Sequence, residues 1–232
     1  MLFRSGGKNE DGTISKEFRS SDIHEVEWKE LKMMPEGRYD CAATYLNDFL
    51  YVTGGYDEKG TRLSNMVRFN LKTRRWSSGG PCMLEPRSGH QLISSNGCLY
   101  AIGGNSRELE EFIPELNRWK VIEYLPVVDL STWTSAAACE KKILIIVDEK
   151  MYSFDVDSRI LKFEKNVPAR SKIVSVEDNF AMVTEDGSIK ELKDNFDFKN
   201  KQHCSDVVKG NYLLYSQYEV QEERRSFWGY GF

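Results

Sequence analysis

Hydrophobic residues in this chain fall in short runs, separated by turns of Gly, Asn, Asp or charged residues. The clearest pattern spans residues 38–76. It opens with small and apolar residues, turns at Asn47-Asp48 and continues as an apolar run from Phe49 to Thr53. Asn and Asp favour tight hairpin turns, and short apolar runs between turns favour strands. The pattern therefore predicts a small antiparallel sheet of four strands, the last two beginning near Met66 and Arg75.

The same pattern returns along the chain, each time with an apolar strand that runs into two glycines. The pairs are Gly6-Gly7, Gly54-Gly55 and Gly103-Gly104, and the steps between their first members are 48 and 49 residues. Spacing this regular identifies a repeat protein. An aromatic residue and a tryptophan follow at an offset of seven, as Phe69 with Trp76 and as Phe112 with Trp119. Because the offset is constant, we expect each pair to be buried across one hairpin.

Later units keep the apolar positions and lose the glycines and the tryptophan. In the fourth unit a strong strand ends on Asp148-Glu149, and Phe154 and Leu161 keep the offset of seven. The first unit begins on what should be its second strand, so it has no first strand of its own. We assign repeat units to residues 1–34, 35–84, 85–127, 128–166 and 167–203, a partial unit to 204–216, and a C-terminal tail without an assigned structure to 217–232.

An arginine, a glycine pair, an aromatic residue and a tryptophan in a unit of about 50 residues resemble the kelch repeat. The resemblance implies an all-β fold, a kelch-type β-propeller of four-stranded antiparallel blades. It implies about five to six blades, with the last one incomplete or degenerate. Family propellers close by letting one terminus complete a blade begun by the other, which favours a six-bladed ring sealed by the C-terminal segment. The chain is most similar to the kelch part of BTB-kelch proteins. Their BTB and BACK domains are absent from it, so we expect a fragment or a shortened isoform.

Composition narrows the classes of partner. The net charge is −4, with basic and acidic residues interspersed, which disfavours nucleic acid or an anionic membrane as the main partner. No stretch approaches the roughly 20 apolar residues that cross a bilayer. The five cysteines are an odd number without close pairs, which favours reduced thiols in the cytoplasm or the nucleus.

Candidate chemistry is scarce. The histidines, His24, His90 and His203, lack the spacing of a metal site, and no cysteine pair has it either. No nucleophile elbow, P-loop or dinucleotide fingerprint is present. Copper-dependent galactose oxidase is a related propeller, but it needs a His and Tyr cluster that is not recognisable here. We therefore predict no catalytic residue, no metal and no cofactor, in a protein that is not an enzyme.

The resemblance also implies a face for partners, built from the loops that follow the glycine pairs and the loops that end at each leading arginine. At the matching positions this face carries Arg38, Tyr56, Asp57, Arg87, Asn105, Arg107, Trp133 and Arg170. A ring of arginines suits an acidic or phosphorylated peptide. In the alternative, Arg38, Arg87 and Arg170 bond backbone carbonyls between blades. We expect residues 8–20 to form a solvated loop over the same face.

The function implied by the resemblance is substrate recognition for a cullin-RING ubiquitin ligase, with the cullin bound only through domains absent from this chain. The first alternative is a cytoskeletal kelch scaffold that binds actin. The second is a propeller-based metal-dependent oxidase or hydrolase. Metal analysis and co-sedimentation with filamentous actin separate these alternatives.

Overall fold

The computed structural model describes residues 2–21, 27–127, 134–176, 179–192 and 198–200, which form five antiparallel sheets. The first sheet holds β1 (Leu2–Ser5), β2 (Phe18–Ser21) and β3 (Lys29–Glu30). The second holds β4 (Ala42–Leu46), β5 (Phe49–Thr53), β6 (Met66–Asn70) and β7 (Arg75–Ser77). The third holds β8 (Gln91–Ser95), β9 (Cys98–Ile102), β10 (Glu108–Ile113) and β11 (Arg118–Tyr124), with the 3-10 turn η1 (Pro114–Leu116) before its last strand. The fourth holds β12 (Thr134–Cys139), β13 (Lys142–Val147), β14 (Lys150–Asp155) and β15 (Ile160–Asn166). The fifth holds β16 (Lys172–Val176), β17 (Asn179–Val183), β18 (Ile189–Leu192) and β19 (Phe198–Asn200).

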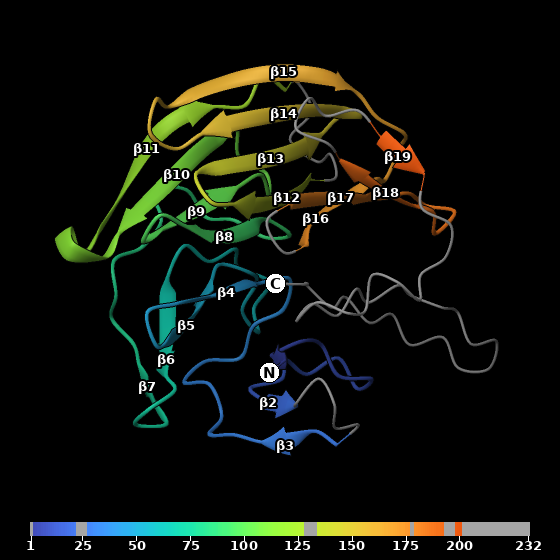
Figure 1. Ribbon diagram of the computed structural model, residues 1–232. Coiled ribbons are helices and arrows are strands. Elements are labelled where there is room, and N and C mark those ends of the chain that lie inside the picture. Colours follow the sequence, from blue (N-terminus) through green and yellow to red (C-terminus); the bar gives the residue numbers. More distant parts are fainter. Residues whose placement is uncertain (1, 22–26, 128–133, 177–178, 193–197, 201–232) are drawn as a thin grey trace.

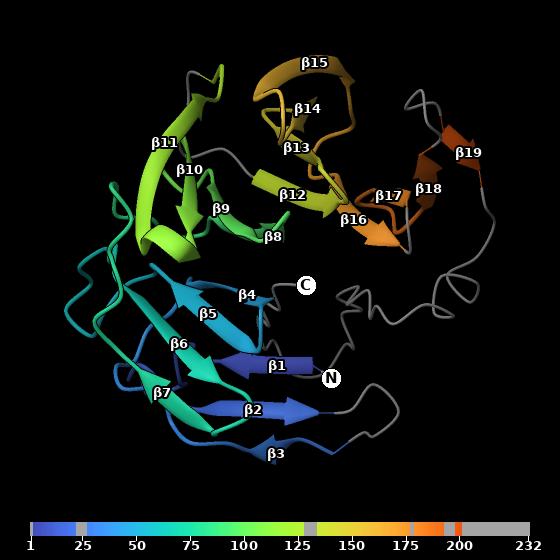
Figure 2. The same ribbon diagram turned by 60° about the vertical axis from the view of Figure 1, so that its left-hand side comes forward.

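The five sheets are the blades of a β-propeller, which confirms the predicted fold class. They follow one another around a common centre (Figure 1), and their strands lie in chain order within each sheet. Figure 2 shows the same succession from β1 at the bottom to β16–β19 at the right. The first strands of successive blades, β4, β8, β12 and β16, contact one another in turn. The first blade has three strands, as expected for a unit without a first strand of its own. The expected sixth unit, and with it the sealing of the ring, lies outside the described residues.

The offset of seven between aromatic residues corresponds to direct pairing across the last hairpin of a blade. Phe69 pairs with Trp76 and Phe112 with Trp119. Phe112 and Trp119 are buried against Tyr51 of the preceding blade. Burying one such ring stabilises the fold by roughly 2–3 kcal/mol from its area alone. The hairpin pairs therefore fill the space between neighbouring blades.

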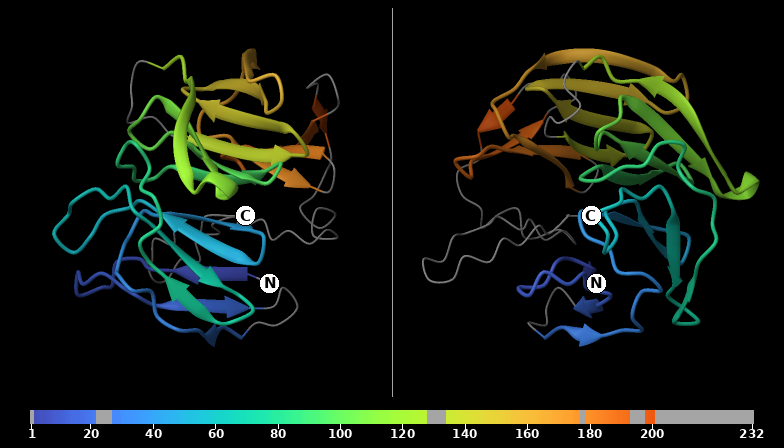
Figure 3. Two further views of the ribbon diagram at one scale, coloured as in Figure 1. Left: turned by 90° about the vertical axis from the view of Figure 1, so that its left-hand side faces the viewer. Right: turned by 180° about the vertical axis from the view of Figure 1, so that it is seen from behind.

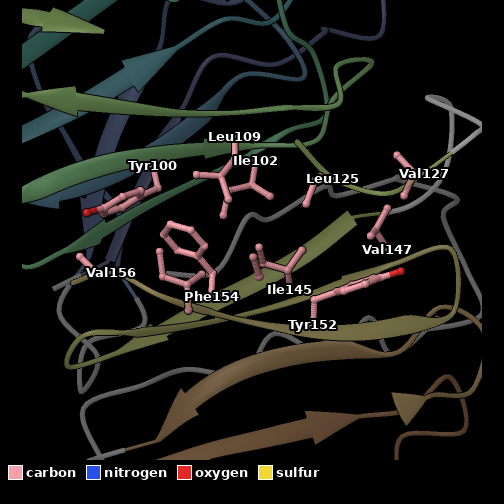
Figure 4. Packing of buried hydrophobic residues seen from close by; sticks show 12 residues of the cluster. Tyr100, Ile102, Leu109, Leu125, Val127, Ile145, Val147, Tyr152, Phe154 and Val156 are labelled. Atoms are coloured by element: carbon pink, nitrogen blue, oxygen red, sulfur yellow. The ribbon is translucent and has the colours of Figure 1, made fainter. Parts of the chain in front are cut away.

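The interface between the third and fourth blades shows how packing continues without the glycines. Figure 4 shows Tyr100 and Leu109 of one blade facing Ile145 and Phe154 of the next, and these residues belong to one buried cluster. Asp148-Glu149 replaces the glycine pair as a two-residue hairpin turn, with φ angles of 51° and 57°. Non-glycine residues adopt these angles at about 1–2 kcal/mol each. Burial of apolar side chains therefore stabilises the fourth blade, which lacks the glycine pair.

The segment 8–20 is more regular than the solvated loop that the sequence predicts. Its last part belongs to strand β2, and Phe18 is buried against Phe69 and Trp76 of the second blade. The prediction was wrong for residues 18–20, because a single phenylalanine among polar residues gives no alternating pattern. The strand pairs with β1 and packs through Phe18 against the neighbouring blade.

Candidate functional site

The glycine pairs join neighbouring blades through the backbone. The N–H of Gly7 donates to the carbonyl of Arg38 (2.9 Å), and the N–H of Gly55 donates to the carbonyl of Arg87 (2.8 Å). The first glycine of a pair has no room for a side chain, because a Cβ on Gly54 would lie 2.4 Å from the Arg87 carbonyl oxygen. Its φ of 61° is also in the region that favours glycine. The pairs are therefore sites of close backbone contact between blades.

The side chains of Arg38 and Arg87 also bond to glycine pairs, and both side chains are 0% exposed. Nη1 of Arg38 donates to the Gly54 carbonyl (3.1 Å), and Nη1 of Arg87 donates to the Gly103 carbonyl (2.8 Å). Burial lowers the pKa of Arg38. Each arginine thus holds the glycine turn of its own blade, while its backbone carbonyl accepts from the preceding blade. Both guanidinium groups are therefore buried and bond backbone carbonyls, but they do so within their own blade and not between blades as the alternative expected.

Glu110 is the buried counter-ion of Arg87. Its carboxylate accepts from Nη2 of Arg87 at 2.8 Å and from Nε at 3.2 Å. It also accepts from the backbone N–H groups of Leu84 (2.7 Å) and Glu85 (3.2 Å) in the segment that enters the third blade. Both partners of the ion pair are 0% exposed. Because four donors bond to it, Glu110 holds both the Arg87 side chain and the backbone of the segment that enters the third blade.

Sequence reasoning missed Glu110, although a signal was present. It stands two residues before Phe112, the position that Val67 occupies before Phe69 in the second unit. A carboxylate at an apolar repeat position indicates a buried ion pair. In the second blade Val67 stands at this position, and Arg38 instead pairs with Glu36 at 3.5 Å, whose side chain is largely exposed.

The other predicted arginines lie at the surface. Arg170 is exposed and pairs with Glu185 at 3.0 Å, so it does not occupy the buried position of the leading arginines. Arg107 is also exposed, and its Nε donates to the Leu125 carbonyl at 3.4 Å. Trp133 lies outside the described residues. The arginines therefore do not form a ring on one surface in the described part of the chain.

Two loops of the same construction follow the first two glycine pairs, and we name residues 8–14 and 56–62 the finger loops. In each, the N–H of the second residue donates to the carbonyl of the sixth, at 2.9 Å and 3.0 Å. In each, the first and last residues form an antiparallel bridge. The two loops share Glu, Gly and Thr at matching positions, a similarity that the search for glycine pairs overlooked. After the third glycine pair only residues 105–107 precede β10, and the fourth blade has a two-residue turn at this place, so we use the name for blades one and two alone.

Asp57 holds the second finger loop in shape. Its carboxylate accepts from the backbone N–H groups of Lys59 (2.9 Å) and Thr61 (2.7 Å). Hydrogen bonds from Thr61 and Lys59 keep the pKa of Asp57 below its usual value. The predicted site residue Asp57 therefore organises the loop that carries Tyr56 and Arg62.

Two stacked tyrosines lie beside the finger loops, and we name Tyr39 and Tyr56 the tyrosine stack. Their ring centroids are 5.1 Å apart, and their backbones form a bridge. The Arg62 guanidinium lies 5.6 Å from the Tyr56 ring, and Lys8 Nζ lies 6.0 Å from the Tyr39 ring. In the described part of the chain, neither cation has a carboxylate partner. The stack is therefore an aromatic surface flanked by two uncompensated positive charges.

The Tyr56 hydroxyl is held by the neighbouring blade as well as by its own loop. Nη2 of Arg62 donates to it at 3.3 Å. Hydrogen bonding with Ser88 and then with Arg62 lowers the pKa of Tyr56. The Ser88 hydroxyl in turn donates to Oδ1 of Asn105 (3.1 Å). The predicted residues Tyr56 and Asn105 are thus brought together through Ser88, at the junction of the second and third blades.

The other side chains of the described residues that could bind a metal or act as nucleophiles are either buried or far from one another. No set of three or more His, Cys, Asp or Glu side chains is arranged there to hold a metal ion. Burial raises the pKa of the Cys41 thiol to about 11. The same part of the chain contains no helix with the length and apolar character needed to cross a membrane.

Comparison with known proteins agrees with this geometry. The family model for the kelch motif matches residues 37–83, which contain Arg38, the second glycine pair and the Phe69–Trp76 hairpin. The chain is a β-propeller that carries a kelch motif. Kelch-like protein 36 of Bos taurus is 27% identical over 158 residues, which cover 63% of this chain and 25% of the relative. Kelch-like protein 9 of Mus musculus is 37% identical over 97 residues, 40% of this chain and 16% of the relative.

The kelch propeller thus spans about a quarter or less of the length of these curated relatives. A solved structure titled "Structure of YjhT" matches with a TM-score of 0.64 and 15% sequence identity, over 87% of this chain and 84% of that one. At that level of identity the likeness shows the propeller fold alone.

We expect His90 to make the propeller sensitive to acid. Its ring is buried between two blades, with Nε2 2.8 Å from the Thr53 hydroxyl oxygen and Nδ1 without a partner among the described residues. Burial, with the nearby charge of Arg87, lowers its pKa from 6.5 to about 3. Between these values the unfolded chain binds a proton that the folded protein excludes, so the free energy of unfolding falls as the pH falls. We expect His90→Gln to flatten this slope between pH 7 and pH 4.5, measured by urea unfolding. An unchanged slope would show that His90 does not cause the acid sensitivity.

Proposed function

We propose that this kelch propeller is a non-enzymatic interaction module that binds a protein or peptide through the finger loops and the tyrosine stack. The observation that carries the proposal is the Tyr39–Tyr56 stack with Arg62 and Lys8 beside its rings. Tyrosine and arginine dominate the residues that contribute most to binding at protein interfaces. A rigid aromatic surface loses little conformational entropy when a partner covers it.

The chemistry of the surface favours an acidic or phosphorylated peptide. Arg62 and Lys8 can pair with carboxylate or phosphate groups, and the bidentate guanidinium suits both. Arg38 and Arg87 cannot contribute because they are buried and already bonded within the blades. The binding role therefore falls to exposed cations on loops whose backbone is fixed by internal hydrogen bonds.

We further propose that the propeller recognises substrates for a cullin-RING ubiquitin ligase, in the manner of a BTB-kelch adaptor in the cytoplasm or the nucleus. The similarity to kelch-like proteins supports this role. In such an adaptor the propeller binds the substrate, and the cullin is bound by other domains. Inhibition of cullin activation should then raise the cellular abundance of the bound protein.

The binding surface is tested by reversing one charge. We expect Arg62→Glu to reduce the proximity-labelling yield of the main partner by at least about tenfold, because it removes a hot-spot arginine and repels an acidic ligand. The matched control is Arg118→Glu, since Arg118 is exposed at the start of β11, at the opposite end of the strands from the finger loops. Equal yields from the two variants would contradict the proposal. Sedimentation with filamentous actin, lost in Arg62→Glu, would instead support the cytoskeletal alternative.

A further inference from the structure

The outer edges of the five blades differ in length. The last strands of the first, second and fifth blades are short: β3 has two residues, and β7 and β19 have three each. The last strands of the third and fourth blades, β11 and β15, have seven each. Among the described residues, no strand lies beyond any of them. A long free edge offers a row of backbone donors and acceptors to another strand.

Strand β15 is the more available of the two long edges. In the third blade the Trp119 indole N–H donates to the Pro81 carbonyl (3.2 Å), which ties β11 to the segment that enters the blade. Leu161 stands at the corresponding position of β15 and has no such donor. Ile160 and Phe163 of β15 are 61% and 49% exposed. Figure 3 shows this yellow-orange strand at the outer margin of the molecule, at the top of the right-hand view.

The sequence of β15 is complementary to itself in the antiparallel direction. If two copies pair about a two-fold axis at Phe163, Lys162 lies opposite Glu164 of the partner subunit, and this occurs twice by symmetry. Opposite charges facing each other across a strand pair are stabilising. Lysine on an edge strand usually discourages pairing, but here Lys162 Nζ already lies 3.2 Å from Oε2 of Glu164. Glu164 is in turn held by the Ser153 hydroxyl at 2.6 Å.

We propose that β15 is an interaction surface for a second copy of this chain, paired antiparallel about Phe163. The two four-stranded blades then form one continuous sheet of eight strands, and the two Phe163 side chains cover each other. A two-fold pairing of this kind is closed, so it gives a dimer and leaves no further β15 edge exposed. The finger loops lie on blades one and two, away from β15. The dimer therefore presents two binding surfaces at once, which increases the avidity for a partner with two matching segments.

Charge exchange across the dimer tests the register. Analytical ultracentrifugation of the full chain should show a dimer that dissociates on dilution. We expect Lys162→Glu and Glu164→Lys each to raise the dissociation constant by about tenfold, because each places like charges opposite one another twice. An equimolar mixture of the two variants should dimerise as the natural chain does, because unlike charges then face each other in both pairs. Lys141→Glu, which breaks the exposed pair with Asp157 away from this edge, should leave the dissociation constant unchanged.

The mixing experiment distinguishes an effect of the charge pairs between two copies from an effect of the Lys162–Glu164 pair within one strand. Both variants lack the internal Lys162–Glu164 pair, so an effect through that pair predicts no recovery on mixing, and such a result would overturn the proposal. A chain that remains monomeric at every concentration would overturn it as well, and would leave the edge to a strand of another protein. As a second measurement, Phe163→Cys should form a disulfide-linked dimer in a Cys82→Ser background. Ile160→Cys should not, because a two-fold axis at Phe163 does not bring residue 160 opposite residue 160 of the other copy.

Discussion

Replacing Gly54 with alanine is expected to lower the free energy of unfolding by about 3–5 kcal/mol. An alanine Cβ would lie 2.4 Å from the Arg87 carbonyl oxygen and 2.8 Å from Cε1 of His90. Neither atom can move freely, because the Arg87 carbonyl accepts from Gly55 and His90 is packed between two blades. The second and third blades must therefore separate at their joint. Urea unfolding measures the loss, with the change in unfolding midpoint as the primary value.

Gly60→Ala is the matched control for Gly54→Ala. Gly60 also has a positive φ, 74°, but nothing lies within 4 Å of the position that its Cβ would take. Only the conformational strain of alanine then remains, about 1 kcal/mol. If the two variants lost the same free energy of unfolding, the close contact between blades would not be what requires glycine at position 54.

Replacing Glu110 with alanine is expected to lower the free energy of unfolding by about 3–5 kcal/mol, because it leaves the Arg87 guanidinium buried without a counter-ion. The same change removes the acceptor for the backbone N–H groups of Leu84 and Glu85. Water cannot replace these bonds without opening the interior, since both members of the ion pair are 0% exposed. Thermal and urea unfolding of the variant measure the effect.

The control for Glu110→Ala is Glu185→Ala, which breaks the pair of Glu185 with Arg170. That pair has a similar distance, 3.0 Å, but its side chains are 75% and 62% exposed. An exposed pair of this kind contributes less than about 1 kcal/mol. Partner binding is a second measurement. Under conditions in which the Glu110→Ala variant is folded, it should bind the partner as the natural chain does, because Glu110 lies outside the finger loops. A small effect of Glu110→Ala on the free energy of unfolding would mean that other groups stabilise the charge of Arg87.

The sequence determined the local features of this protein. Apolar runs ending on glycine pairs predicted the strands, because strand formation and turn conformation depend on adjacent residues. The constant offset between Phe112 and Trp119 predicted a hairpin, and the two residues are direct partners across it. The regular spacing of the units predicted a repeat protein, since each unit can bury its apolar faces only against its neighbours, and the resemblance to the kelch repeat implied a propeller.

The tertiary structure alone decided which polar residues are available to a partner. Arg87 and Arg170 look alike in sequence, but one is buried against Glu110 and the other is paired at the surface. The tyrosine stack likewise brings together residues 39 and 56, and its flanking lysine comes from the first blade. Burial and charge compensation depend on atoms supplied by neighbouring blades, whose contacts no local pattern encodes. The sequence was therefore sufficient to predict the repeat, whereas the proposed binding surface could be identified only from the packing of the blades.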